Sequence, residues 1–216
     1  MSGVIDHIFG KVIYSTHIDI DTEAIIDNLG IPRKSTLQRE MKDYPDSPKE
    51  TLYVLERPEF KYLKEAVMEK IYEYTKDVMK WSCDFEITTS WFNEIEPGDG
   101  SHSHCHTNAL ISGVVYLRAN PDSGNITFTD WSYKQIRPIP TEHWIHNAQQ
   151  WTYVPENKMM LIFPSDLWHK IEENKSNENR YSLAFNVMPV GTIGNDNIDS
   201  HMKIKYGQIP IFGKQL

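Results

Sequence analysis

Cysteines, long apolar runs and leader signals are scarce or missing in this chain. Its 216 residues include two cysteines, Cys83 and Cys105, too few for a disulfide framework, so we expect a reducing, cytoplasmic setting. No stretch approaches the roughly 20 apolar residues of a membrane-spanning helix. The N-terminus lacks a basic region followed by an apolar one, so no secretory signal is expected. Membrane association is therefore not predicted.

Positive charge is also scarce. Asp and Glu number 30 against 22 Lys and Arg, which gives a formal net charge of −8. Binding to a phosphate backbone needs clustered Lys and Arg, so a nucleic-acid partner is not expected. The sequence has no glycine-rich phosphate loop and no Gly-x-Ser-x-Gly elbow, and neither kind of site is predicted.

What is present is the composition of one globular domain, which we place at residues 1–216. Hydrophobic residues make up 39% of the chain, enough for a core. A short helix is predicted at 21–29, with Asp21 or Thr22 as its cap and Gly30 at its end. The strongest helical pattern spans 58–81, where apolar residues recur at steps of three and four. Residues 20–81 are thus the expected helical support; the apolar positions of the second helix are Phe60, Leu63, Val67, Ile71, Tyr74 and Val78.

The pattern changes to a strand-like alternation after Cys83. Phe85, Ile87, Thr89 and Trp91 alternate with polar residues and predict a strand with these four on one face. Further strands are predicted at 12–14, 109–117, 125–129, 158–163 and 181–187, and 189–216 is expected to be irregular or a final edge strand. Short strands separated by turns indicate a mainly β sandwich or barrel.

Histidines gather at one point of this pattern. His102, His104 and His106 have the same strand parity, so they would share one face. A His-x-His pair is weak evidence alone, because a solvated strand end also explains it. His169 strengthens the metal hypothesis, since it follows an apolar strand and a turn at 165–169, and Arg180 begins the next strand.

Several ordered motifs together resemble a known family. They are WFN at 91–93, HCHTNALISGVVYL at 104–117, SGNITF at 123–128, LIFPSDLWH at 161–169 and RYSLAFN at 180–186. In this order they resemble the 2-oxoglutarate- and Fe(II)-dependent oxygenases of bacteria and bacteriophages, a prolyl-hydroxylase-like group. The resemblance covers about residues 85–190.

The resemblance implies a double-stranded β-helix, or jelly roll, at about residues 84–190. It also implies a dioxygenase that uses Fe(II), 2-oxoglutarate and O2, and that hydroxylates an unidentified small molecule or peptide. Fe(II) accepts imidazole ligands and leaves positions open for a cosubstrate, and the planar fork of arginine suits a carboxylate. Carried over to this chain, the metal ligands are His104, His106 and His169, and the 2-oxoglutarate residues are Arg180, Ser182, Tyr116 and Asn93.

One position departs from the family pattern. Where the wider superfamily has a carboxylate, this chain has His106. Three histidines also suit zinc with a bound water, and Asp99 or His102 is an alternative ligand. Two other functions therefore stay open: a cupin-like jelly-roll protein that uses zinc or manganese without 2-oxoglutarate, and a non-catalytic binding module.

An aromatic-rich segment at 131–155 has no clear periodicity. It is predicted either to cover the substrate site or simply to pack on the sheet. Trp131, Tyr133 and Trp144 are the candidate substrate-lid residues. Trp91 and Phe128 are expected in the core.

Overall fold

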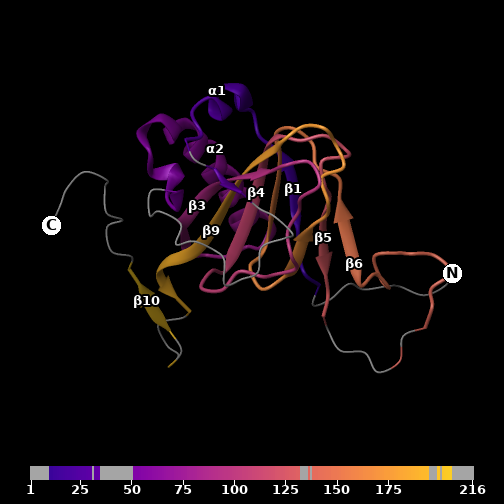
Figure 1. Cartoon of the computed structure of the whole chain (residues 1–216). Coiled ribbons are helices and arrows are strands. Elements are labelled where there is room, and N and C mark those ends of the chain that lie inside the picture. The colour runs from indigo at the N-terminus through magenta and orange to yellow at the C-terminus, as the bar shows by residue number, and fades with distance from the viewer. Residues whose placement is uncertain are drawn as a thin grey trace.

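The chain folds into two facing β-sheets with helices on the outside of the larger one (Figure 1). A computed structural model describes residues 10–30, 32–34, 51–131, 136, 138–194, 199 and 201–205. In the described part, the helices cover one face of a seven-stranded sheet, and a three-stranded sheet lies against the other face. We refer to these as the major and minor sheets.

The major sheet places β9 at its centre. Its order is β1 (Tyr14–His17), β7 (Met159–Pro164), β4 (Ile111–Arg118), β9 (Arg180–Ile193), β3 (Asp84–Ile95) and β2 (Arg33–Lys34), and β10 (Met202–Ile204) pairs with the far end of β9. All pairs are antiparallel except β2 with β3. The sheet therefore brings motifs from both halves of the chain side by side.

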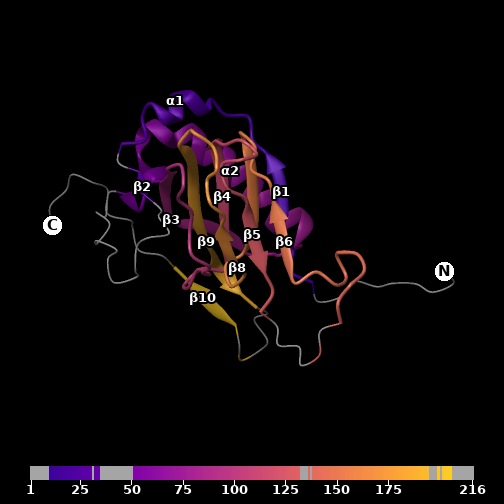
Figure 2. The same cartoon turned by 45° about the vertical axis from the view of Figure 1, so that its right-hand side comes forward.

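The minor sheet is formed by β6 (Gln150–Tyr153), β5 (Ile126–Thr129) and β8 (Trp168–Ile171). In Figure 2 these strands lie in front of β4 and β9. The segment before β4 extends the sheet, because Ser101 N–H donates to the Ile171 carbonyl and His104 forms an isolated antiparallel bridge with His169. The two sheets form the predicted double-stranded β-helix.

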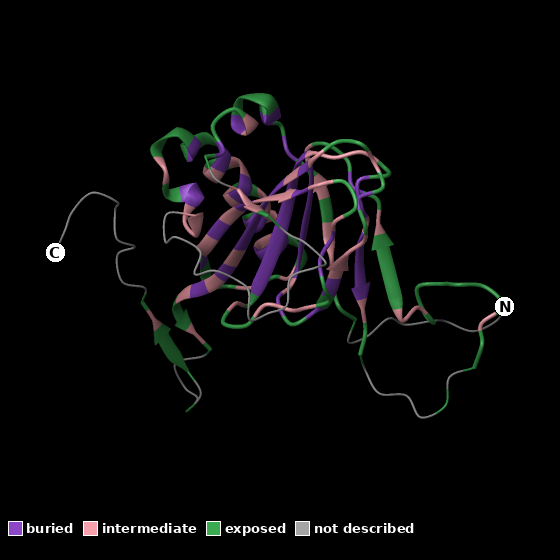
Figure 3. Cartoon of the chain, in the orientation of Figure 1, coloured by how far each residue is buried: buried purple, intermediate pink, exposed green. Residues whose placement is uncertain are grey.

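The major sheet separates two hydrophobic interiors. Alternate residues of β9, such as Leu183 and Phe185, face the helices, where they join the larger core. The opposite face packs against the minor sheet around Phe128 and Phe163. Figure 3 shows the central strands as the most buried part of the fold, while β6 is exposed. Polar residues on the inter-sheet face therefore stand out, and the candidate site lies there.

The helical support is close to its prediction. Asp21 caps α1 (Thr22–Ile26) by accepting from the Ala24 N–H at 3.1 Å, and Gly30 adopts a positive φ of 74° after it. The long helix begins with a 3-10 turn (Pro58–Phe60), continues as α2 (Lys61–Tyr72) and ends as a π-helix (Glu73–Val78). Val54–Glu56 forms a separate 3-10 turn of three residues.

The π-helix corrects one residue of the predicted apolar face. Its wider turn shifts the residues that follow Tyr74 around the axis. Val78 is 45% exposed, while Thr75 is fully buried and donates its hydroxyl to the Ile71 carbonyl. Phe60, Leu63, Val67, Ile71 and Tyr74 are buried as predicted.

A β-bulge corrects the predicted face of β3. The pairing with β9 shifts between Ile87 and Thr89, and an extra residue in one strand turns the following side chains to the other face. Phe85 and Ile87 join the helix-side core. Thr89 and Trp91 instead lie opposite Asn186 and Ala184 on the inter-sheet face.

Three of the described strands were not predicted, namely β2, β6 and β8. β4, β5, β7 and β9 match their predicted positions to within a few residues, although β9 continues to Ile193. His169 was expected in a turn and lies in β8. Within the described residues, no helix is long and apolar enough to cross a membrane.

Candidate metal centre and cosubstrate pocket

Three histidines from two segments meet at one end of the minor sheet. One potential ligand atom from each of His104, His106 and His169 lies within 4.8 Å of the other two. Their ring centroids are 4.5 to 5.4 Å apart. The backbone bridge between His104 and His169 brings the two segments together, so the fold itself assembles the group.

The outer nitrogen of each ring is already engaged. His104 Nδ1 lies 2.8 Å from the His102 carbonyl oxygen, and His169 Nδ1 lies 2.9 Å from that of Leu167. A carbonyl only accepts, so both Nδ1 atoms carry the proton and both Nε2 atoms offer a lone pair. Neutral imidazoles in this tautomer are the form that binds a metal. The donor set therefore fits a metal ion.

Burial keeps the inner histidines uncharged. His169 is 5% exposed and packs against Phe128 and Phe163, with ring centroids 5.8 and 5.0 Å away. This desolvation, together with the neighbouring His104, lowers the pKa of His169 to about 3. Burial also lowers the pKa of His106. A metal ion approaching these two residues has no proton to displace at neutral pH.

The alternative ligands lie outside this group. Among the described residues, neither Asp99 nor His102 contributes a ligand atom to it. His102 takes part through its backbone carbonyl, which orients His104. Cys105, between the two histidines, is a free and half-buried thiol that is likewise not part of the group.

A buried arginine lies at the other end of the same interior. Arg180 is 1% exposed, and its Nη1 donates to the Gly124 carbonyl at 2.9 Å. Its Nε and Nη2 are buried without a hydrogen-bond partner, and so is the hydroxyl of Tyr116. The guanidinium lies over the Tyr116 ring. Burial lowers the pKa of Arg180 and raises that of Tyr116. Three buried donors that converge without an acceptor fit the carboxylate of a ligand.

Ser182 and Asn93 lie in register with Tyr116 on neighbouring strands. Ser182 pairs with Tyr116 on one side and with Asn93 on the other, so all three share the inter-sheet face. Asn93 Oδ1 accepts the indole N–H of Trp91 at 3.1 Å. Trp91, expected as a core residue, is half-buried, and its ring centroid lies 5.7 Å from that of His106.

The candidate lid residues do not converge on the histidines in the described structure. Trp131 is 63% exposed and packs edge-on against Trp168, and Trp144 is 56% exposed beside His146. Tyr133 lies outside the described residues. Trp151, which the sequence did not single out, pairs with Phe128 and so shares a face of the minor sheet with Phe128 and His169.

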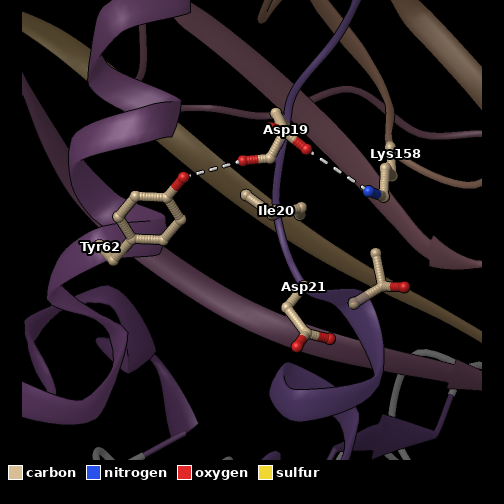
Figure 4. A pocket seen from close by; sticks show the side chains of 6 residues that line it. Asp19, Ile20, Asp21, Tyr62 and Lys158 are labelled. Carbon is tan, nitrogen blue, oxygen red and sulfur yellow. Dashed lines mark hydrogen bonds and ion pairs between the residues drawn. The ribbon is translucent and has the colours of Figure 1, made fainter.

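A surface pocket lies away from these residues. It has a volume of about 490 Å³ and lies between the segment that precedes α1 and the helix α2 (Figure 4). Tyr62 donates to the Asp19 carbonyl, and Lys158 forms an ion pair with the Asp19 carboxylate. None of the predicted site residues lines it, and it holds neither a metal-ligand group nor an unpaired buried donor, so the histidine and arginine residues remain the candidate site.

A known protein family matches the region of the chain that contains the three histidines and Arg180. Residues 89–186 match the model of a family described as "Putative 2OG-Fe(II) oxygenase". Over this segment the chain is similar to the 2OG-Fe(II) oxygenases. The segment contains all three histidines, Arg180 and the polar residues around them. Comparison with curated proteins finds no match.

Solved structures agree with the oxygenase fold. HygX from Streptomyces hygroscopicus, solved with iron bound, has a TM-score of 0.53 at 13% identity, over 83% of each chain. AviO1 from Streptomyces viridochromogenes has a TM-score of 0.53 at 10% identity, over 82% of this chain and 89% of that one. A 2OG-Fe(II) oxygenase-family protein from Burkholderia pseudomallei has a TM-score of 0.47 at 12% identity, over 81% of this chain and 65% of its own length. At these identities the likeness concerns the fold.

Proposed function

We propose that the chain is an Fe(II)- and 2-oxoglutarate-dependent dioxygenase that hydroxylates a substrate still to be identified. His104, His106 and His169 hold the metal, and Arg180 holds the far carboxylate of 2-oxoglutarate with Tyr116, Ser182 and Asn93 beside it. We further propose that residues 1–216 act as one domain in the cytoplasm, with O2 and a small molecule or peptide as the other reactants.

The observation that carries this proposal is the unpaired Arg180. A buried arginine without an acidic partner is strongly disfavoured unless a ligand supplies the charge. No ion pair of Arg180 is found among the described residues. An anionic group that accepts from Nε, Nη2 and the Tyr116 hydroxyl would satisfy all three donors.

The spacing of the two features suits a short dicarboxylate. β5 connects them, because Gly124 accepts from Arg180 just before the strand and Phe128 packs on His169 within it. Four residues of a strand span about 13 Å, and an extended five-carbon dicarboxylate is proposed to lie between the two features.

In this proposal the residues of the chain bind the metal, orient the cosubstrate and shield both from water. The histidines would hold the metal through Nε2, and the guanidinium would hold and orient one carboxylate of the cosubstrate. The walls formed by Phe128 and Phe163 exclude water from the side of His169. The oxidation itself is supplied by bound iron, 2-oxoglutarate and O2.

Anaerobic titration tests the proposal. Adding Fe(II) and then 2-oxoglutarate to the purified protein is expected to give the visible absorption band of the chelate. Circular dichroism on the same sample checks folding. Folded protein that gives no band would contradict the proposal.

The neutral ligand set favours one alternative, a cupin-like protein that holds zinc or manganese. Three histidines and a water are a common zinc arrangement. Metal analysis of protein purified without chelators separates the two functions. Stoichiometric zinc, with no 2-oxoglutarate turnover on addition of Fe(II), would favour the alternative. A non-catalytic module would bind neither 2-oxoglutarate nor Fe(II), and the Arg180→Met variant would then behave like the wild type.

A further inference from the structure

His106 differs from the other two histidines in the hydrogen-bond partners of its Nδ1 atom. Backbone carbonyls orient His104 and His169, but His106 Nδ1 lies between two side chains, 2.7 Å from Asn186 Oδ1 and 2.9 Å from Ser112 Oγ. A side chain can rotate or be replaced, whereas a substitution does not remove a backbone carbonyl. The orientation of His106 therefore depends on specific residues.

These residues form a polar row across three strands of the major sheet. Asn186 on β9 pairs with Thr89 on β3 and with Ser112 on β4, so the three side chains lie next to each other on the inter-sheet face. Asn186 Nδ2 donates to Thr89 Oγ1 at 3.0 Å, and Ser112 Oγ lies 2.8 Å from Asn186 Oδ1 as a donor. Ser165 Oγ, 3.0 Å from Ser112 Oγ, extends the row.

Within this row the oxygen of the Asn186 amide is the atom that meets His106. With Nδ2 donating to Thr89, the carbonyl oxygen Oδ1 faces His106 and accepts the Nδ1 proton. The opposite orientation of the amide would present an N–H group, which would move the imidazole proton to Nε2 and remove the lone pair that a metal needs. In the orientation present, Ser112 Oγ donates to the amide oxygen and Thr89 Oγ1 accepts from the amide nitrogen.

We propose that Asn186 is a positioning residue for the metal centre, which fixes the tautomer and ring orientation of His106 and is itself oriented by Thr89. This inference rests on the proposed metal site. Asn186 accepts the Nδ1 proton of His106 without charge, whereas an Asp or Glu at this position would add a negative charge. The chain thus has a neutral ligand at 106 and a neutral partner behind it.

Each substitution in this row is expected to change metal affinity in a defined direction. Asn186→Leu removes the acceptor at similar volume and is expected to weaken metal binding by about 10- to 100-fold, the usual effect of losing such a partner. Asn186→Asp keeps an acceptor and adds a charge, so binding is expected to be as tight as in the wild type or tighter. Thr89→Val frees the amide to turn, and a smaller loss of up to about 10-fold is expected.

Thr88→Val is the matched control. Thr88 is the neighbouring residue on β3, and its hydroxyl donates to the backbone carbonyl of Asn186 at 3.3 Å, not to the amide side chain. The same Thr to Val change is made one residue away, so any general effect on the strand appears in both variants. Only the Thr89 variant is expected to lose metal affinity.

Titration of the metal-free proteins with Co(II) alone is the test. The visible absorption of Co(II) reports both affinity and ligand geometry, and thermal denaturation checks that each variant is folded. Weaker binding by Asn186→Leu and Thr89→Val, with Asn186→Asp and Thr88→Val unaffected or tighter, supports the inference. Wild-type affinity in Asn186→Leu and Thr89→Val, or equal losses in Thr88→Val and Thr89→Val, overturns it. A folded wild type that binds no Co(II) would instead contradict the proposed metal site as well.

Discussion

The guanidinium of Arg180 lies over the ring of Tyr116, with Cζ 4.8 Å from the ring centroid. A similar pair lies on the helix side of the same sheet, where Arg118 Cζ is 5.6 Å from the Tyr181 ring. The second pair has polar partners: Arg118 bonds to Glu23, and the Tyr181 hydroxyl bonds to Glu94. The first has buried donors without a hydrogen-bond partner. The comparison offers matched controls for the proposed cosubstrate site.

Replacing Arg180 by methionine should abolish the stabilisation that 2-oxoglutarate gives. Removing the cation that a bound carboxylate faces costs about 2–5 kcal/mol of binding energy. At 100 times the dissociation constant, a ligand stabilises a protein by about 2.7 kcal/mol, which raises the melting temperature. We expect this rise in the wild type with metal and 2-oxoglutarate, but not in Arg180→Met.

Arg118→Met is the control, and it should keep the full rise. Without ligand, Arg180→Met is expected to be at least as stable as the wild type, because a buried unpaired charge is lost. An equal response of both variants to 2-oxoglutarate would rule out Arg180 as its anchor.

The Tyr116 hydroxyl is expected to make a smaller contribution to the same proposed site. Its loss in Tyr116→Phe removes one hydrogen bond to a charged group, worth about 1.5 kcal/mol, which lowers affinity for 2-oxoglutarate roughly tenfold. Stability without ligand should not fall, since the hydroxyl has no partner there. Isothermal titration gives the affinity. Tyr181→Phe should show the reverse, with lower stability and unchanged affinity.

Gly124 is expected to tolerate no side chain. It has a φ of +92°, and a Cβ atom would lie 2.3 Å from the Glu172 carbonyl oxygen. Its own carbonyl accepts from Arg180. Gly98 has a similar φ of +84° but open space around it, so Gly98→Ala measures the backbone strain alone, about 1–2 kcal/mol. Gly124→Ala should lose about 1–3 kcal/mol more in chemical denaturation and should also weaken 2-oxoglutarate binding. Equal losses would contradict the close approach.

The stability of the metal-free protein should fall as the pH drops below about 6.5. Burial lowers the pKa of His169 to about 3, while in the unfolded chain it is about 6.5. Between these values the unfolded state binds the proton and the folded state does not, so acid favours unfolding. From pH 7 to 5 the loss is about 2 kcal/mol.

The difference between wild type and His169→Asn isolates this effect. Denaturation curves at several pH values, with a chelator present, should show a shallower dependence in the variant. His143→Asn, at an exposed position, is the control and should follow the wild type. The same slope in all three proteins would contradict the buried, neutral His169.

The sequence predicted those parts of the fold that local pattern determines. The cap at Asp21, the apolar stripe up to Tyr74 and the apolar strands follow from spacing and residue type. The π-helix and the bulge at Thr88 were not predicted, because both insert a residue into an otherwise regular pattern. β8 was read as a turn because its short polar sequence gains strand structure only by pairing with β5 and with His104.

Part of the candidate site was also predicted from the sequence. The three histidines and Arg180 were nominated from motif order, and their roles stay predictions. The polar row around Asn186 was out of reach, because the neighbours of Thr89 and Ser112 are set by register across strands, which no local pattern contains.

The two-sided character of β9 makes a scan along this strand informative. Tyr181, Leu183, Phe185 and Val187 serve the helix side, whereas Arg180, Ser182 and Asn186 serve the site. Substitutions at successive positions should therefore alternate between two effects. Those on the site side should give folded protein that binds metal or cosubstrate poorly, and those on the helix side should give unstable protein whose metal ligands are unchanged. A mutational scan of β9 can measure protein abundance and metal content in parallel. The two effects should then alternate from one residue to the next along the strand.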